Sequence, residues 1–264
     1  MDRIRNGTQN AVNAGKEFGS RHPYIGQVLL AIAFIFAFII VAHLLLTAYK
    51  TYSKWASGSP WVLHGTKSAK KRMIVLQDPK RMGHITLQRS NNEYGGLEFS
   101  YAFWMFIDDW SYKYGEWKHI MHKGNESSWP LRAPGMWLHP KDNTMRVYMN
   151  TFKKVDEYVD IENIPLNKWV SVVVAVKQRN LDIFVNGNLA KRHVLSGIPK
   201  QNSGDLYINS FRGFSGFMSN IRYYDYYLSF AEMDTFLALG PSKKPCVDTG
   251  ETPPYLDITW WADK

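Results

Sequence analysis

The segment from Trp169 to Val176 reads Trp-Val-Ser-Val-Val-Val-Ala-Val and decides the fold. β-branched residues dominate it, and the residues on both alternating faces are apolar or small. A strand of this composition is buried on both sides, so we expect it at the centre of a sheet that packs against another layer. We expect Trp169 to fill the space between the two sheets.

The residues that follow predict a meander. Lys177 to Asn180 is polar and turns the chain, and residues 181–186 then alternate as a second strand. Asn186-Gly187 comes next, which is the strongest short hairpin signal because both turn residues tolerate positive φ. Three consecutive antiparallel strands are therefore expected.

Further short strands are separated by turn residues at intervals typical of a β-sandwich. They are expected at 73–77, 85–88, 97–107, 117–122, 135–139, 144–150, 157–161, 206–209 and 216–224. Ser229 and Glu232 have the spacing of a capping box, which predicts a short helix that ends at Gly240-Pro241. The sequence thus predicts an all-β domain over residues 73–240 with one short C-terminal helix.

The N-terminal part has a different composition. Residues 25–49 contain no charged side chain and, at about 37 Å as a helix, are long enough to cross a hydrocarbon core of about 30 Å. A cleaved signal peptide is the alternative, but the apolar run is too long for one. We predict a transmembrane helix over 25–49, a polar arm over 1–24, a juxtamembrane linker over 50–72 and hence a single-pass membrane protein.

Positive charge is concentrated after this helix. The whole chain has a net charge of +9, and residues 50–90 carry nine basic side chains and one acidic side chain. A nucleic-acid-binding domain would carry its charge on the fold itself. Anionic lipid headgroups are therefore the predicted partners of Lys67, Lys70, Lys71 and Arg72, with a solvated linker as the alternative. The positive-inside rule favours the cytosolic side for the large domain.

The C-terminal segment, residues 241–264, is Pro-rich and ends in large aromatic side chains. We predict that Tyr255, Trp260 and Trp261 dock on a partner protein, because a free tail rarely carries so much apolar area. Folding of the segment back onto its own domain is the alternative. The lone Cys246 excludes an internal disulfide framework.

Several motifs resemble those of one fold family. Phe99 to Met105 resembles the opening strand of concanavalin A-like, laminin-G-like jelly rolls, and His119 to Gly124 resembles the strand that follows. Later segments resemble that family in the same order: Ile164 to Trp169, Leu181 to Gly187, Phe214 to Phe217, Asn220 to Tyr224 and Leu228 to Glu232. The resemblance spans about residues 85–239 and implies a jelly-roll β-sandwich. It implies little about function, because the fold hosts lectins, glycosidases and interaction modules.

One membrane helix before such a sandwich also resembles membrane-anchored minor capsid proteins of large icosahedral DNA viruses. This second resemblance implies a non-enzymatic structural protein with capsid proteins as partners. Its role would be to tether the inner membrane of a virion to the capsid, with the large domain on the capsid-facing side.

A membrane-anchored lectin is the main alternative, because sugars dock on exposed aromatic faces that have polar neighbours. Trp110, Tyr112 and Tyr114 lie in one predicted loop, and Asn125, Glu126 and Trp129 lie in another. We expect both loops on the same rim of the sandwich. Rings that are buried as loop anchors are the other interpretation.

Catalysis is not predicted. Retaining glycosidases need two carboxylates about 5–5.5 Å apart. The nearest candidates are Glu157, Asp160 and Glu162, and Glu157 is out of phase with the other two on a strand. An active or degenerate glycoside hydrolase is therefore the third hypothesis.

No cofactor or metal site is predicted. His119 and His122 are three residues apart on a predicted strand and should lie on opposite faces, which disfavours a shared zinc ion. Members of the fold family that this sequence resembles often bind calcium through Asp and Asn in loops. Calcium is accordingly the one alternative cofactor, with Asp108, Asp109, Asn125 and Asp205 as its ligands.

Overall fold

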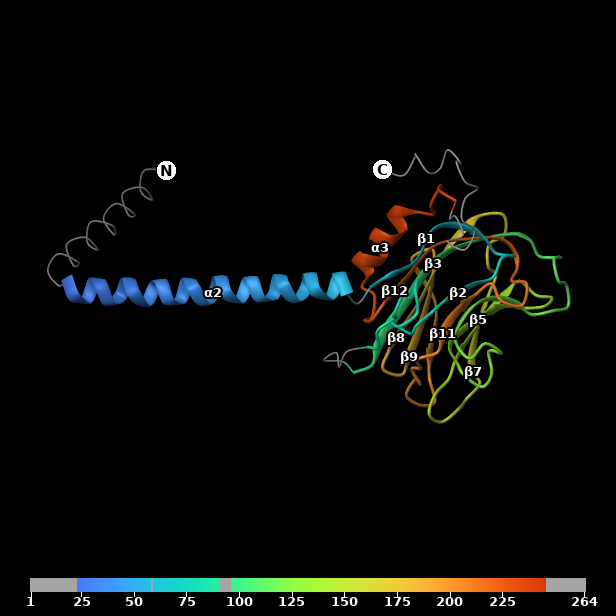
Figure 1. Ribbon diagram of the computed structural model, residues 1–264, viewed down its shortest axis with the longest axis horizontal. Helices are drawn as coiled ribbons and strands as arrows, with labels where there is room; N and C mark the ends of the chain where they lie inside the picture. The colour runs from blue at the N-terminus through green and yellow to red at the C-terminus, as the bar shows by residue number, and fades with distance from the viewer. Residues whose placement is uncertain (1–22, 58, 91–95, 246–264) are drawn as a thin grey trace. The chain divides into compact units, whose positions relative to one another are not determined.

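A computed structural model describes residues 23–57, 59–90 and 96–245 (Figure 1). The chain divides into two compact units, with the boundary between Trp55 and Ala56. Almost all of the polar arm predicted over 1–24 lies outside the described residues.

Helix α2 (Pro23–Ser57) begins in the first unit and ends two residues past the boundary; it has 35 residues and is therefore about 52 Å long. Its segment Leu30–Tyr49 has a mean hydropathy of 2.7, and none of that segment is buried in the protein. Within the described part of the chain, this is the one helix long and apolar enough to cross a membrane. The helix continues past residue 49, where a linker was predicted.

The second unit is a sandwich of two six-stranded antiparallel sheets. Sheet A consists, in spatial order, of β1 (Trp61–Ser68), β12 (Ser215–Tyr224), β3 (Glu98–Asp109), β8 (Trp169–Lys177), β9 (Asn180–Val185) and β10 (Asn188–Val194). Sheet B consists of β2 (Met73–Val75), β11 (Asp205–Ile208), β4 (Lys118–Gly124), β5 (Arg132–Leu138), β6 (Thr144–Met149) and β7 (Glu157–Glu162). The predicted two-layer all-β fold is confirmed.

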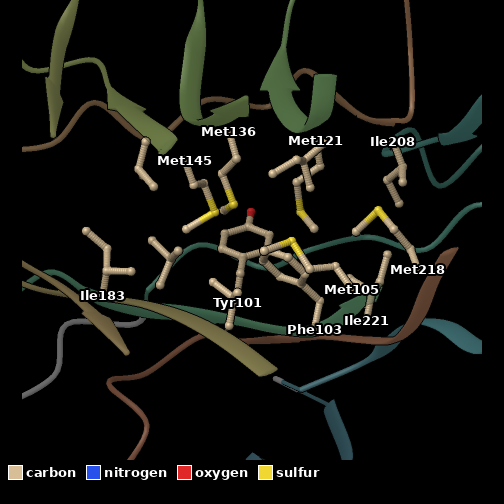
Figure 2. Packing of buried hydrophobic residues seen from close by; sticks show 14 of the residues in the cluster. Tyr101, Phe103, Met105, Met121, Met136, Met145, Ile183, Ile208, Met218 and Ile221 are labelled. Carbon is tan, nitrogen blue, oxygen red and sulfur yellow. The ribbon is translucent and has the colours of Figure 1, made fainter. Parts of the chain in front are cut away.

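The core lies between the two sheets, where Figure 2 shows Tyr101, Phe103 and Met105 of β3 opposite methionines of sheet B. Met121, Met136 and Met145 come from three neighbouring strands of that sheet and are fully buried. Methionine side chains are unbranched and adapt to irregular gaps, so they fill the space left between the larger rings.

Strand β8 has the central, doubly buried position that its sequence predicts. Val170, Val172 and the next alternate valines face the core between the sheets. Val173 and Ala175 point the other way, into a second apolar cluster that includes Met233 and Phe236 of helix α3 (Phe230–Leu239). Both faces are apolar because this strand lies in the middle of three layers.

The position predicted for Trp169 is wrong. It does not lie between the sheets; it is half-buried on the outer face of sheet A, in phase with Val173. Its ring centroid is 5.6 Å from that of Phe106. Because strand side chains alternate, Val170 is the first residue of β8 that enters the core.

The predicted meander is confirmed by the consecutive neighbours β8, β9 and β10. Asn186 and Gly187 form its second turn with φ values of 50° and 81°, as the Asn-Gly signal requires.

Residues 85–88 form no strand, contrary to prediction. The capping box is confirmed, since the side chains of Ser229 and Glu232 each bond the other's backbone N–H.

The predicted linker over 50–72 is wrong for residues 61–68, which form β1 at the edge of sheet A. Its pairing with β12 shifts register twice, and the consecutive residues Val62 and Leu63 are therefore both buried. These irregularities remove the two-residue alternation by which a strand is identified in a sequence.

The C-terminal segment begins against this strand. The Thr66 N–H donates to the Lys244 carbonyl (2.9 Å), and the Thr66 hydroxyl donates to the Ser242 carbonyl (2.6 Å). The sandwich domain therefore extends beyond the predicted limits of 73–240 on both sides.

Candidate functional site

The outer face of sheet B carries large aromatic and arginine side chains, which distinguishes it from an ordinary solvated sheet surface. We call it the aromatic–arginine face; its members are Trp117, Trp129, Arg132, Trp137, Arg146, Tyr148, Tyr158 and Tyr207. Register supports this grouping, since Arg146 is opposite Trp137 on one side and Asp160 on the other, and Tyr148 is opposite Tyr158. Directly opposite residues share a face of the sheet.

Arg146 is held firmly on this face. Its Nε and Nη2 donate to the two carboxylate oxygens of Asp160, each at 2.7 Å. The guanidinium carbon lies 3.9 Å from the ring centroid of Tyr158 and 4.8 Å from that of Trp117. The hydrogen bonds to Asp160 raise the pKa of Arg146. This arginine is neutralised within the protein and serves to order the neighbouring rings.

Arg132 has a different environment at the start of β5. Its guanidinium carbon lies 3.6 Å from the ring centroid of Tyr148, and 5.5 Å from those of Trp129 and Trp137. No carboxylate in the described segments lies within ion-pair distance of it, and its buried Nε has no hydrogen-bond partner. Burial lowers the pKa of its guanidinium from the ordinary value.

A buried histidine pair lies beneath the face. A β-bulge at Ile120 turns both Ile120 and Met121 into the core, so His119 and His122 lie on the same face of β4. The expectation that they lie on opposite faces is wrong, because strict alternation does not survive a bulge. His119 Nε2 is 2.7 Å from His122 Nδ1, and both side chains are inaccessible to solvent.

The hydrogen bonds around this pair form a directed chain. The Ser210 N–H donates to His119 Nδ1 (3.0 Å), His119 Nε2 donates to His122 Nδ1, and His122 Nε2 donates to the Asn125 carbonyl (2.7 Å). Each ring is therefore neutral with one defined tautomer. Burial lowers the pKa of His122 to about 4 and lowers that of His119 well below its usual value. In the segments that the structure describes, no group of three or more His, Cys, Asp or Glu side chains could hold a metal ion.

Two of the predicted glycan-binding residues lie at this face. Trp129 has 54% of its surface exposed and stands beside Arg132. Asn125 supports the loop that presents it, since the Asn125 side-chain amide donates to the Trp129 carbonyl (3.2 Å). The loop is also fixed to the histidine pair through the Asn125 carbonyl.

The predicted glycan-binding residues Trp110 and Tyr112 do not lie at this face. Trp110 and Tyr112 belong to the connection that enters β4, whereas Asn125 and Trp129 belong to the connection that leaves it. The two loops are therefore at opposite ends of β4, and the expectation of a shared rim is wrong. Trp110 Nε1 donates to the Lys141 carbonyl and the Tyr112 hydroxyl donates to the Arg212 carbonyl, so both act as loop anchors.

The four residues predicted to meet a membrane surface do not form one cluster. Lys67 is largely buried in β1 and, with Lys71, lines an open hollow of about 330 Å³ beside Phe217. The Lys70 ammonium lies over the Tyr112 ring, 4.8 Å from its centroid. Arg72 forms an ion pair with Glu126 at 2.5 Å. Contact of these residues with lipid stays a prediction.

The candidate carboxylates are separated, as their phase on the strand predicts. Asp160 and Glu162 lie on the outer face of β7, whereas Glu157 is buried on the other face and accepts a hydrogen bond from the Ser196 hydroxyl (2.6 Å). Burial opposes ionisation of Glu157, but its hydrogen bonds to Ser196 and His193 outweigh this and lower its pKa.

The calcium candidates are distributed over distant loops. Asp108 and Asp109 end β3, whereas Asn125 and Asp205 lie beside the far end of β4. The Asp109 carboxylate accepts hydrogen bonds from Ser111, and that of Asp205 accepts one from the Gln77 N–H (2.8 Å). Calcium binding stays a prediction.

The predicted docking residues Tyr255, Trp260 and Trp261, and also Cys246, lie outside the described residues.

Sequence reasoning missed Arg132, Arg146, Tyr148 and Tyr158. A signal was present in β6 and β7, where the outward positions of alternating strands hold Arg-x-Tyr and Tyr-x-Asp. Aromatic rings at solvent-facing strand positions of several neighbouring strands indicate a surface with a role beyond solubility.

Comparison with known proteins agrees with this fold. The ligand-binding domain of botulinum neurotoxin serotype D in complex with N-acetylneuraminic acid has a TM-score of 0.51 and 10% identity, over 70% of this chain and 45% of that one. The receptor-binding domain of the C/D mosaic serotype (TM-score 0.44, 11% identity, 54% and 36% coverage) and the serotype G binding domain (0.41, 18%, 54% and 36%) are also similar. This chain spans less than half the length of each of these three chains.

No curated protein matches the sequence. The family model described as the concanavalin A-like lectin/glucanases superfamily matches residues 80–233, which is more than half of the chain and includes nearly every strand of both sheets. The chain belongs to the concanavalin A-like lectin/glucanases superfamily.

Proposed function

We propose that this protein is a membrane-anchored, non-catalytic binding module that recognises a carbohydrate at the aromatic–arginine face. The observation that carries the proposal is that Trp129 and Tyr158 are 54% and 43% exposed on this face while each ring lies against an arginine, Arg132 and Arg146 respectively. Exposed, immobilised rings offer flat apolar surfaces to the C–H faces of a sugar, and little side-chain entropy is lost when it binds.

Two further observations support this reading. The fold is that of a lectin-containing superfamily, and the neurotoxin domain with the TM-score of 0.51 was solved with N-acetylneuraminic acid. The carboxylates on β7 are unsuited to glycoside hydrolysis, because Asp160 is bound by Arg146 and Glu157 lies on the opposite face.

The test is a glycan array probed with the full-length chain in detergent micelles. For a sugar that binds, Trp129→Ala should weaken the affinity about tenfold, which corresponds to about 1.4 kcal/mol of lost stacking. Tyr114→Ala is the matched control, because Tyr114 is a more exposed ring (66%) in the loop at the other end of β4. Equal losses in the two variants, or no sugar bound by the unaltered chain, would refute the proposal.

The membrane anchor is part of the same proposal. Helix α2 presents unburied apolar side chains along Leu30–Tyr49, so removal of residues 1–57 should convert a detergent-requiring protein into one that remains in the supernatant after carbonate extraction. Persistent pelleting of the shortened chain with membranes in high salt would show that the sandwich itself binds lipid.

A second candidate function is a tether between a membrane and a protein layer, such as the inner membrane and the capsid of a large DNA virus. It is favoured by the aromatic C-terminal sequence with Trp260 and Trp261, which a carbohydrate-binding role leaves unused. Mild crosslinking in the native membrane separates the two functions. Capture of a coat protein that is lost when residues 255–264 are deleted would support the tether.

A further inference from the structure

We infer that the ligand of the aromatic–arginine face is an acidic sugar and that Arg132 binds its carboxylate. The inference rests on the proposed carbohydrate-binding function and adds the chemical class of the sugar. It follows from a difference between Arg132 and two nearby arginines, Arg146 of the same face and Arg72 next to it.

Arg132 and Arg146 of this face, and Arg72 next to it, all lie over aromatic rings, and the protein neutralises two of the three. Arg146 has the two-point ion pair with Asp160, and Arg72 has Glu126 at 2.5 Å while lying 5.6 Å from the Tyr207 ring centroid. Arg132 has three rings around it and, in the part of the chain that the structure describes, no carboxylate at ion-pair distance.

The environment of Arg132 strengthens its attraction for an anion. The side chain is half-buried among three aromatic rings, so a nearby negative charge is screened less than it would be in water. Its buried Nε–H has no acceptor, which leaves the positive charge less compensated by hydrogen bonding than that of Arg146. A guanidinium presents parallel N–H donors that match the two oxygens of a carboxylate.

The backbone positions this arginine. The Arg132 N–H donates to the Asn150 side-chain oxygen, and the Asn150 amide donates to the carbonyls of Pro130 and Val155. Asn150 thereby joins the loop that carries Trp129 to the first residue of β5 and to the segment before β7. A preorganised cation loses little freedom when its ligand arrives.

The neighbouring Trp129 favours a sugar over an acidic protein side chain. Its exposed ring lies 5.5 Å from the Arg132 guanidinium carbon, so one pyranose ring can stack on it while a carboxylate on that ring reaches the guanidinium. An Asp or Glu side chain has no apolar ring face for Trp129 to contact. A uronic or sialic acid has both groups on one residue.

The experiment compares ligands that differ in the carboxylate alone. Calorimetry with the full-length chain in detergent would use oligogalacturonate against its methyl ester, and 3′-sialyllactose against lactose. The acidic member of at least one pair should bind ten times more tightly or better, and Arg132→Gln should reduce that ratio to near one. Arg72→Gln is the matched control and should leave the ratio unchanged, because Glu126 already neutralises Arg72.

The outcomes distinguish this inference from the proposed function. Equal binding of both members of each pair through Trp129 would overturn the acidic class while leaving carbohydrate binding in place. Binding of no sugar, charged or neutral, would overturn both. Tight binding of poly-glutamate with no binding of the acidic sugars would assign Arg132 to a protein ligand instead. The comparison of ligands on the unaltered chain stays decisive even if Arg132→Gln folds poorly.

Discussion

Lowering the pH from 7 to 5 should reduce the free energy of unfolding by about 2 kcal/mol through the buried His122, with a further loss through its partner His119. In the unfolded chain both imidazoles titrate near pH 6.5. In the folded protein burial lowers the pKa of His122 to about 4 and that of His119 well below its usual value. The folded state therefore binds fewer protons, and stability is lost as the pH falls from about 6.5 towards 4. The loss is about 2 kcal/mol for His122 by pH 5, and the loss through His119 has the same sign.

The structural reason is that neither ring has room for a second proton. Each nitrogen of the pair already donates or accepts one defined hydrogen bond. A second proton on His122 Nδ1 would face the His119 Nε2–H at 2.7 Å, and one on His119 Nδ1 would face the Ser210 N–H at 3.0 Å. Arg72 and Arg132 also act against a positive charge on His122. The loss is a large share of the total stability of a typical domain, about 5–15 kcal/mol.

Denaturant melts at pH 7, 6 and 5 measure this effect. The double variant His119→Leu, His122→Phe should be less stable at pH 7 but should lose most of the dependence on pH, whereas His64→Gln, at an exposed position, should retain it. Glu157 does not interfere, because its lowered pKa makes it lose its contribution at more acidic pH. Equal slopes for the unaltered chain and the double variant would contradict the explanation.

Phe103→Ala should lower the free energy of unfolding by about 3–5 kcal/mol, and Trp169→Ala should cost clearly less. Phe103 is fully buried between the sheets, and its removal leaves a cavity (Figure 2). The surrounding methionines can relax into part of that space, which favours the lower end of the range. Trp169 is larger but half-buried on the outer face of sheet A, so it loses less contact area.

The order of these two losses tests the phase of strand β8 and its neighbours. Chemical denaturation of both variants in one buffer gives the comparison directly. A larger loss for Trp169→Ala would mean that the side chains of β8 point the other way, as a shift of register by one residue requires.

Regular elements were predictable from the sequence, and irregular ones were not. β8 and its Asn-Gly turn depend on local composition and spacing, which is why the central meander was identified with its correct neighbours. At β1 the sequence predicts a linker, because the double register shift of this strand breaks the alternation. A similar irregularity made the histidine pair unpredictable, since one bulge at Ile120 reverses the face on which His119 lies.

The candidate site was found only in part. Trp129 and Asn125 are noticeable in sequence because they lie in a loop of unusual composition. Arg132 is not, because what distinguishes it is the absence of an acidic partner among residues that are brought together from β4–β7. Pairing across strands depends on register, which spacing within one segment does not reveal.

The pairing of β1 with β12 also has a consequence for the time at which this domain can fold. Thr66 bonds Ser219 across a sequence separation of 153 residues, and the chain then continues to residues 242–244, which cover the outer edge of the same strand. During synthesis, β1 is among the first segments of the sandwich to leave the ribosome. Its partner strand β12 is among the last, so β1 stays unpaired for most of that time. Contacts of such separation form slowly. Until then the Val62–Leu63 segment is left uncovered, so chaperones that hold apolar segments should bind this chain early and release it late.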